Sequence, residues 1–237
     1  MSARRPVELL AAQDLSPSVR GLELRCIDGE PLLFDAGQWV DLHVETPGGA
    51  EKRAYSIASA PGMDDPARFE LAVTRVDGGL VSNTIHTLGP GARLEIDGPH
   101  GFFTREATRD EPAVFVGTGT GLCPLRSMLQ DALRQPPGPP LTLLFGCRTQ
   151  ADILWRDELE DWSRSGRVDV HVTLSRPEAG WVGRTGYVQT HVAELVATAP
   201  RPHIYICGLS RMVSEVRRVL KQELGFDRRS IHSERYD

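Results

Sequence analysis

A glycine-rich segment in the middle of this 237-residue chain is well suited to bind a phosphate. It reads VGTGTGLCP over residues 116–124 and follows a short apolar run. Glycine lets a backbone approach a ligand closely, and a helix that begins here offers free N–H groups to an anion. Leu122 breaks the GxGxxG fingerprint of dinucleotide-binding proteins, and the Gly-Lys-Ser/Thr of a Walker A loop is absent. The segment therefore predicts either a phosphate-binding turn or only a tight strand-to-helix connection.

A second candidate lies in the first half of the chain, where KRAYSIAS covers residues 52–59. The two-residue period of a strand places Arg53, Tyr55 and Ile57 on one face. The arginine could neutralise a pyrophosphate, the tyrosine could cover a flat ring, and the Ser56 hydroxyl could bond to the edge of that ring. An ordinary amphipathic strand fits the same residues, so this segment alone does not establish a ligand.

A third candidate is SRP at residues 175–177, which follows an apolar run at residues 168–174. A hydroxyl and a guanidinium at the carboxyl end of a parallel strand could hold an additional phosphate. The preceding run ends in FGCR at residues 145–148, without the acid that usually binds the ribose of NAD. The segment therefore favours NADPH, unless Ser175 is only a capping residue beside a surface arginine.

These candidates lie in two halves with different hydrophobic periods. The first hundred residues contain short β-rich runs separated by turn signals such as TPGG, DGG and GPG, which is typical of an antiparallel barrel or sandwich. From about residue 109, strands alternate with helices, which predicts a doubly wound α/β unit with a parallel sheet. We therefore expect two domains, residues 1–108 and residues 109–237.

The hydrophobic pattern also predicts where the elements lie. In the first half it predicts strands at residues 20–27, 39–44, 53–58, 69–75 and 94–97, and a helical turn at 81–88. In the second half it predicts strands at residues 113–116, 141–145, 168–174 and 203–207, and helices at 122–134, 155–165 and 210–224.

Composition and charge exclude several classes of protein. The net charge of −5 argues against binding to duplex nucleic acid, which requires a basic face. No apolar run approaches the roughly 20 residues of a membrane span, and Glu8 and Asp14 interrupt any apolar core of a signal peptide, so we expect a cytoplasmic protein. We expect no metal site, because HExxH and CxxC are absent and the cysteines stand far apart, at Cys26, Cys123, Cys147 and Cys207.

Six basic residues gather near the C-terminus. They are either a solvated helix face or a surface for an acidic protein partner. The residues are Arg211, Arg217, Arg218, Lys221, Arg228 and Arg229.

Taken together, seven segments in order resemble the ferredoxin–NADP reductase family of FAD-dependent oxidoreductases. They are RAYSIAS, GGLVSN, GTGTGLCP, FGCRTQADILW, TLSRP, ICGLSRM and IHSERYD. The resemblance implies a β-barrel FAD-binding domain followed by an α/β NAD(P)-binding domain. It also implies FAD as cofactor and NADPH as electron donor, with NADH possible because several relatives with a similar RPEAGWVGRTGYV stretch use NADH.

The resemblance also assigns roles to residues on the flavin side. Arg53 would pair with the FAD pyrophosphate, Tyr55 would pack on the isoalloxazine, and Ser56 would bond near flavin N5. Val81 and Ser82 would donate to the pyrophosphate at a helix start.

On the nucleotide side, Ser175 and Arg176 would hold the 2′-phosphate with help from Arg148. Glu234 and Tyr236 match the C-terminal pattern of an acid followed by an aromatic residue near the flavin, although Asp237 follows the tyrosine. We expect Ser56, Cys207 and Glu234 to be the catalytic residues, by tuning geometry and charge. The remaining residues expected to border the dinucleotide are Gly117, Thr118, Gly119, Thr120, Cys207, Gly208 and Met212.

The family resemblance implies a reductase that takes hydride from NADPH, or NADH, onto bound FAD. It would then pass electrons to an acidic acceptor protein such as ferredoxin, flavodoxin or an oxygenase component. Two alternatives stay open at this point: a reductase that uses free flavin as a substrate, and a non-catalytic electron-transfer subunit.

Overall fold

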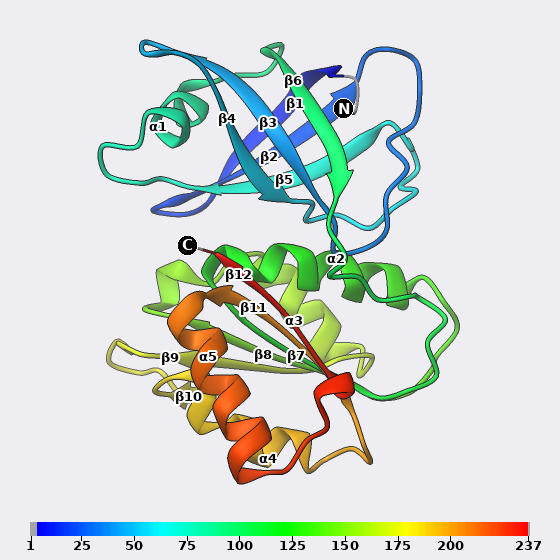
Figure 1. Ribbon diagram of the computed structural model, residues 1–237. Helices are drawn as coiled ribbons and strands as arrows, with labels where there is room; N and C mark the ends of the chain where they lie inside the picture. The colour runs from blue at the N-terminus through cyan, green and yellow to red at the C-terminus, as the bar shows by residue number, and fades with distance from the viewer. Residues whose placement is uncertain (1–3, 237) are drawn as a thin grey trace.

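The computed structural model describes residues 4–236, whose strands form two sheets (Figure 1). Within these residues the first sheet has the spatial order β4-β3-β6-β1-β2-β5, and every neighbouring pair is antiparallel. Just beyond β4, Ile57 pairs with Leu71 of β5. Because this pairing joins the two edge strands, the sheet closes into a barrel. The strands are β1 (Arg5–Ser16), β2 (Val19–Cys26), β3 (Trp39–Thr46), β4 (Gly49–Ser56), β5 (Arg68–Thr74) and β6 (Arg93–His100).

Alternating side chains of these strands form the barrel core. In β3, Val40 and Leu42 are buried and their neighbours are partly exposed, which is the two-residue period of a strand with one face on a core. The helix α1 (Leu80–Thr87) packs on this core through Val81 and Ile85. Its contacts with β3, β4 and β5 fix it to the strand that carries the KRAYSIAS segment.

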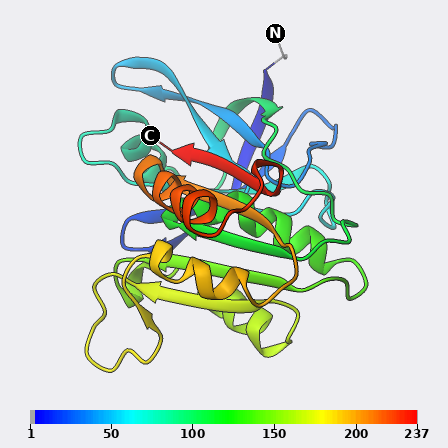
Figure 2. The same ribbon diagram turned by 60° about the horizontal axis from the view of Figure 1, so that its bottom comes forward.

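The second sheet is parallel and has the spatial order β10-β9-β8-β7-β11-β12. Its central strands read as apolar runs because helices cover both faces. One face packs on α2 (Leu122–Leu133) and α3 (Arg156–Arg164), the other on α4 (Val192–Val196) and α5 (Ser210–Arg218) (Figure 2). The strands are β7 (Ala113–Thr118), β8 (Leu141–Cys147), β9 (Asp169–Leu174), β10 (Arg184–Thr185), β11 (His203–Leu209) and β12 (Ile231–Tyr236).

The predicted fold class, an antiparallel barrel followed by a doubly wound α/β unit, is confirmed. Three strands were not predicted from the sequence: β1, the two-residue β10, and β12. The last long helix is shorter than expected, because α5 ends at Arg218 and a π-helical turn follows over Val219–Glu223. The domain boundary between residues 108 and 109 falls in the connection from β6 to β7 and stays a prediction. Residues 4–236 contain no helix both long enough and apolar enough to cross a membrane.

The two units meet at one edge of the second sheet. Figure 1 shows the barrel above this sheet, α2 between them, and β12 ending at the junction. Between β7 and α2, the 3-10 turn η1 (Gly119–Gly121) packs directly on the backbone of β11.

Gly121 is expected to tolerate no side chain. A Cβ there would lie 2.3 Å from the Cys207 carbonyl oxygen, a backbone atom of a central strand. Gly121→Ala should therefore lower the free energy of unfolding by about 1–3 kcal/mol, measured by urea denaturation. Gly89→Ala is the control, because a Cβ there meets no atom within 4 Å, and it should cost less than about 0.5 kcal/mol. Equal losses in both variants would contradict this packing.

Candidate active site

Four side chains from distant parts of the chain meet where the barrel faces the second sheet. The Ser56 hydroxyl, at the end of β4, lies 2.6 Å from the Tyr236 hydroxyl and donates to Glu234 Oε1 at 3.3 Å. Cys207 of β11 is fully buried beside the Tyr236 side chain. Ser56, Cys207, Glu234 and Tyr236 are termed the junction cluster below.

The parallel sheet explains why these residues meet. Cys207 pairs with Gly117 of β7 on one side and with Glu234 of β12 on the other. Because these strands run in the same direction, their carboxyl ends lie at one edge, where α/β sheets bind ligands. The structure thus brings together the three predicted catalytic residues, although Ser56 and Glu234 are 178 positions apart in the sequence.

Burial sets the protonation of the junction cluster. It raises the pKa of Glu234 to about 7, and the hydrogen bond from Ser56 opposes this rise only in part. Burial also raises the pKa of the Cys207 thiol, and the neighbouring Glu234 carboxylate raises it further. At neutral pH, Cys207 is therefore a protonated thiol that packs as a small apolar group, whereas Glu234 can gain or lose its proton.

The glycine-rich turn lies beside the junction cluster. The Thr118 hydroxyl at the end of β7 is buried and has no hydrogen-bond partner among residues 4–236. A Cβ at Gly208 would lie 2.5 Å from this hydroxyl and 2.7 Å from Met212 Cε. Only glycine at position 208 lets β11 pass this close to the unsatisfied Thr118 hydroxyl, because a Cβ there would clash with it and with Met212. An unsatisfied hydroxyl of this kind fits the polar edge of a dinucleotide.

The start of α2 adds N–H groups to the same place. In the described part of the chain no side chain caps η1 or α2, and neither first turn has an acidic residue. Gly119 adopts a left-handed φ of 53° and faces open space. The Thr120 hydroxyl lies 3.3 Å from that of Thr74 in β5, so the turn also touches the barrel. Gly119 is exposed and Thr120 is partly exposed, so the N–H groups of this uncapped turn fit a dinucleotide phosphate.

The residues predicted to bind a 2′-phosphate lie at neighbouring strand ends. The N–H of Arg176 donates to the Arg148 carbonyl at 2.8 Å, and the N–H of Ser175 donates to the Cys147 carbonyl at 3.0 Å. These bonds continue the pairing of β8 with β9 and hold the two arginines side by side. Both side chains are exposed, and within residues 4–236 neither forms an ion pair. Two cations without carboxylate partners fit a phosphate group.

On the barrel side, Arg53 and Tyr55 share a face of β4, because Leu42 and Val40 of β3 oppose them in register. Tyr55 is half-buried against the barrel core, and burial raises its pKa to about 12, so it stays protonated. Arg53 is exposed and forms an ion pair with Glu51 at 3.0 Å. An exposed pair of this kind is weak, so the guanidinium can turn to a phosphate.

Val81 and Ser82 lie in the first turn of α1, and no residue of that turn is acidic. Its N–H groups fit a pyrophosphate, since no side chain of residues 4–236 caps the helix there. The Ser82 hydroxyl accepts from the Val76 N–H at 3.1 Å and donates to the Gly79 carbonyl at 3.3 Å. The only proton of the hydroxyl is thus already donated to the Gly79 carbonyl, and donation from Ser82 to a phosphate stays a prediction.

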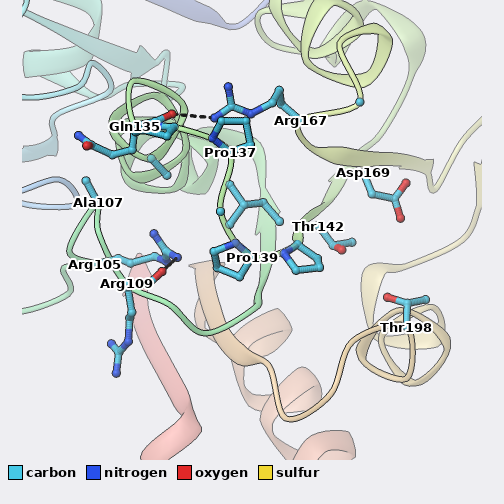
Figure 3. Close-up of a pocket in the computed structure, with 16 residues that line it drawn as sticks. Arg105, Ala107, Arg109, Gln135, Pro137, Pro139, Thr142, Arg167, Asp169 and Thr198 are labelled. Atoms are coloured by element: carbon cyan, nitrogen blue, oxygen red, sulfur yellow. Dashed lines mark hydrogen bonds between the residues drawn. The ribbon is translucent and has the colours of Figure 1, made fainter.

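A separate cavity of about 460 Å³ lies at the amino ends of β8 and β9, away from the junction cluster (Figure 3). Three arginines line it, but each is held by protein groups. Arg105 and Arg167 donate to backbone carbonyls, including that of Gln135, and Arg109 forms an ion pair with Glu111. None of the predicted site residues lines this cavity, so we do not place the active site there.

Inspection of the sequence missed a buried arginine at the contact between the two units. Arg126 of α2 is 7% exposed and bonds to Glu70 of β5 and to Glu158 of α3. A signal for it was present, because Arg126 lies among apolar residues that recur at helical spacing, such as Leu125 and Leu129. A charge within such a stripe indicates a buried partner.

Comparisons with known proteins agree with this geometry. Residues 6–104 match the oxidoreductase FAD-binding domain, and residues 115–218 match the oxidoreductase NAD-binding domain. Ferredoxin–NADP reductase B of Sorangium cellulosum (strain So ce56) is 52% identical over 236 residues, which cover 97% of this chain and 96% of that protein.

Reductases of other systems are more distant. The phenol hydroxylase P5 protein of Acinetobacter pittii (strain PHEA-2) is 31% identical over 96% of this chain, which spans 64% of that protein. The solved structure of an Amycolatopsis cytochrome P450 reductase superposes with a TM-score of 0.85 and 28% identity, over 99% of this chain and 71% of the other. Because a relative at 52% identity matches almost from end to end, the chain belongs to the ferredoxin–NADP reductase family of FAD-dependent oxidoreductases.

Proposed function

We propose that this protein takes hydride from NADPH, or NADH, onto bound FAD and passes electrons to a protein acceptor such as ferredoxin, flavodoxin or an oxygenase component. The observation that carries the proposal is the junction cluster, in which Ser56 of the barrel bonds to Glu234 and Tyr236 of β12. A site built half from an FAD-binding domain and half from an NAD-binding domain suits a reaction between the two cofactors.

Bound FAD would supply the redox chemistry, since a flavin accepts two electrons together and releases them singly. We propose residues 1–108 as the FAD-binding domain and residues 109–237 as the NAD(P)-binding domain, of which Asp237 lies outside the described residues. The chain's own residues bind and orient. Arg53 and the N–H groups of α1 would hold the pyrophosphate, and Tyr55 would pack on the ring system.

The dinucleotide would lie along Gly117–Thr120, with Cys207, Gly208 and Met212 around its nicotinamide end. Cys207 would pack there as an uncharged group. Ser56 and Glu234 would bond to the polar edge of the reacting rings. Because Glu234 changes charge near pH 7, it would tune the electrostatics of the site.

The acceptor is proposed to be an acidic protein. The relatives include a ferredoxin–NADP reductase and a phenol hydroxylase component, whose names indicate protein partners. Of the six basic residues near the C-terminus, Arg218 pairs with Glu215 and Glu223, which removes it from the available charge. The exposed Arg211, Lys221 and their neighbours support docking of an acidic protein surface. We also propose that the protein is cytoplasmic.

The proposal can be separated from its alternatives by following NADPH and NADH oxidation with ferricyanide as acceptor. The FAD-loaded protein should turn over at least one nucleotide, and Cys207→Ala should slow turnover about tenfold while FAD stays bound, because the packing beside the nicotinamide is lost. Cys26→Ala, in the barrel core, is the control and should keep the wild-type rate. No turnover with either nucleotide would favour a non-catalytic electron-transfer subunit, and FAD lost on desalting would favour a free-flavin reductase.

NADPH preference is expected to depend on Arg176. Its exposed guanidinium has no carboxylate partner in residues 4–236, so Arg176→Leu should lower kcat/KM for NADPH about 10- to 100-fold and leave that for NADH nearly unchanged. Arg164→Leu, on the exposed side of α3, is the matched control and should alter neither value. If wild type prefers NADH, or if both nucleotides respond equally, the assignment of Ser175 and Arg176 is wrong.

Glu234 predicts a pH dependence of stability. Its pKa is about 7 in the folded protein, above its ordinary value of 4.5, so the folded state holds a proton that the unfolded state has lost. The free energy of unfolding contributed by this group is therefore fully present below about pH 4.5 and is lost as the pH rises through about 7. Urea denaturation between about pH 4.5 and 8 should show this decline in wild type and not in Glu234→Gln. Parallel curves for the two proteins would contradict the raised pKa.

A further inference from the structure

A buried ion triad joins the barrel to the second unit. Arg126 Nε lies 2.5 Å from Glu158 Oε2, and Arg126 Nη1 lies 2.5 Å from Glu70 Oε2 and donates to the Ala58 carbonyl at 2.9 Å. Ala58 and Glu70 belong to the barrel side, and Glu158 belongs to α3. A single guanidinium therefore bonds to both units. Among the ion pairs of residues 4–236, only Arg126 with Glu70 spans the junction.

Neighbouring groups fix the orientation of this guanidinium. The Trp155 ring lies 4.5 Å from Arg126 Cζ. Trp155 has a φ of 46°, a left-handed conformation that is costly for a bulky residue and is maintained only where the surroundings impose it. Gln130, on the next turn of α2, donates to Glu158 Oε1 at 2.6 Å and accepts from the Ala60 N–H at 2.9 Å. The contact is thus built from several mutually dependent bonds.

The charges of the triad are balanced within the junction. Burial alone would lower the pKa of Arg126, but the carboxylates of Glu158 and Glu70 outweigh that effect and the pKa is raised. The Arg126 side chain is 8% exposed, against 28% for Glu70 and 24% for Glu158. A buried ion pair often adds little to the free energy of unfolding. The rigid, planar guanidinium of Arg126 is nevertheless well suited to specify one arrangement of the barrel relative to the second unit.

Both ends of this connection lead to the candidate active site. On the barrel side, Ala58 follows Ser56 by two residues in the same segment. On the other side, Arg126 lies about 6 Å along α2 from Leu122, at a rise of about 1.5 Å per residue, and Leu122 directly follows the glycine-rich turn. Because the backbone of α2 is hydrogen-bonded continuously between these points, a shift of Arg126 relative to Ala58 would also shift the turn relative to Ser56.

We propose that Arg126, held between Glu70 and Glu158, is a positioning residue that sets how closely the bound nicotinamide approaches the flavin. The inference rests on the proposed function, because it assumes that both cofactors bind at the junction. Small displacements of reacting groups have large effects on rate, so loss of the triad should slow hydride transfer more than it weakens binding of either cofactor.

The kinetic test compares FAD-loaded wild type with Arg126→Met, Arg126→Lys and Glu70→Gln. Flavin reduction by saturating NADPH is followed by stopped-flow absorbance, and FAD retention is measured separately. Arg126→Met and Glu70→Gln should slow reduction about tenfold or more with KM changed less than about threefold, and Arg126→Lys should recover part of the loss because it keeps the charge. Arg5→Met is the matched control: it removes a partly buried ion pair with Asp28 inside the barrel and should leave the rate unchanged.

A second readout does not depend on turnover. Hydrogen–deuterium exchange of the FAD-loaded proteins should be faster at residues 57–60 and 122–130 in Arg126→Met, because the bond to the Ala58 carbonyl is lost. Glu70→Gln should have the same effect, because the guanidinium loses one of the two carboxylates that orient it. The same segments should exchange as in wild type in Arg5→Met.

The outcomes separate this inference from the proposed function. Wild-type rates and wild-type exchange in Glu70→Gln would overturn it, and so would an equal loss of rate in Arg5→Met, which would indicate a general effect of instability. If Arg126→Met fails to fold, Glu70→Gln still removes the ion pair across the junction and leaves the arginine paired with Glu158. A wild-type protein that neither NADPH nor NADH reduces would instead defeat the proposed function.

Discussion

The end of β4 must meet the carboxyl ends of β7, β11 and β12, and the rest of the structure depends on this constraint. The parallel sheet places Gly117, Cys207 and Glu234 next to one another at one edge. They become a site only because closure of the barrel directs Ser56 to that edge, where it bonds to Glu234 and Tyr236. Packing of α2 beneath the barrel, through Arg126 and Gln130, holds the two units in that register.

Water exclusion at this junction gives its polar groups their properties. The thiol of Cys207 stays protonated, and Glu234 is held near its point of half-ionisation, because burial penalises the charged form of each. The Thr118 hydroxyl is buried against Gly208 and has no hydrogen-bond partner among residues 4–236. The features proposed to bind phosphate lie farther out, in exposed arginines and helix N-termini, where an anion could replace water. In the proposed function, such a site would bind the charged phosphates at its edge and keep its centre free of water, which favours hydride transfer over proton leakage.

Much of this arrangement could be predicted from the sequence, and the part that could not is non-local. Hydrophobic period and the GTGTG turn predicted a barrel followed by an α/β unit, and motif resemblance singled out Ser56, Cys207 and Glu234. The strand β12 was missed because IHSERY is polar and half-buried, and its strand state comes from pairing with β11. The hydrogen bond from the Ser82 hydroxyl to the Gly79 carbonyl depends on the conformation of the local turn. The proposed role of Arg126 depends on two carboxylates that are distant in the sequence, Glu70 and Glu158. No periodicity encodes such partners.

The visible absorption spectrum of the purified, desalted protein, recorded without oxygen before and after addition of NADPH or NADH, tests the central claim most directly. The account predicts a flavin spectrum that survives desalting and is bleached by at least one of the two nucleotides, since FAD and nicotinamide are proposed to meet at the junction cluster. A folded but colourless protein would contradict the roles given to Arg53, Tyr55 and the N-terminus of α1. A retained flavin that neither nucleotide bleaches would contradict the role given to the junction cluster itself.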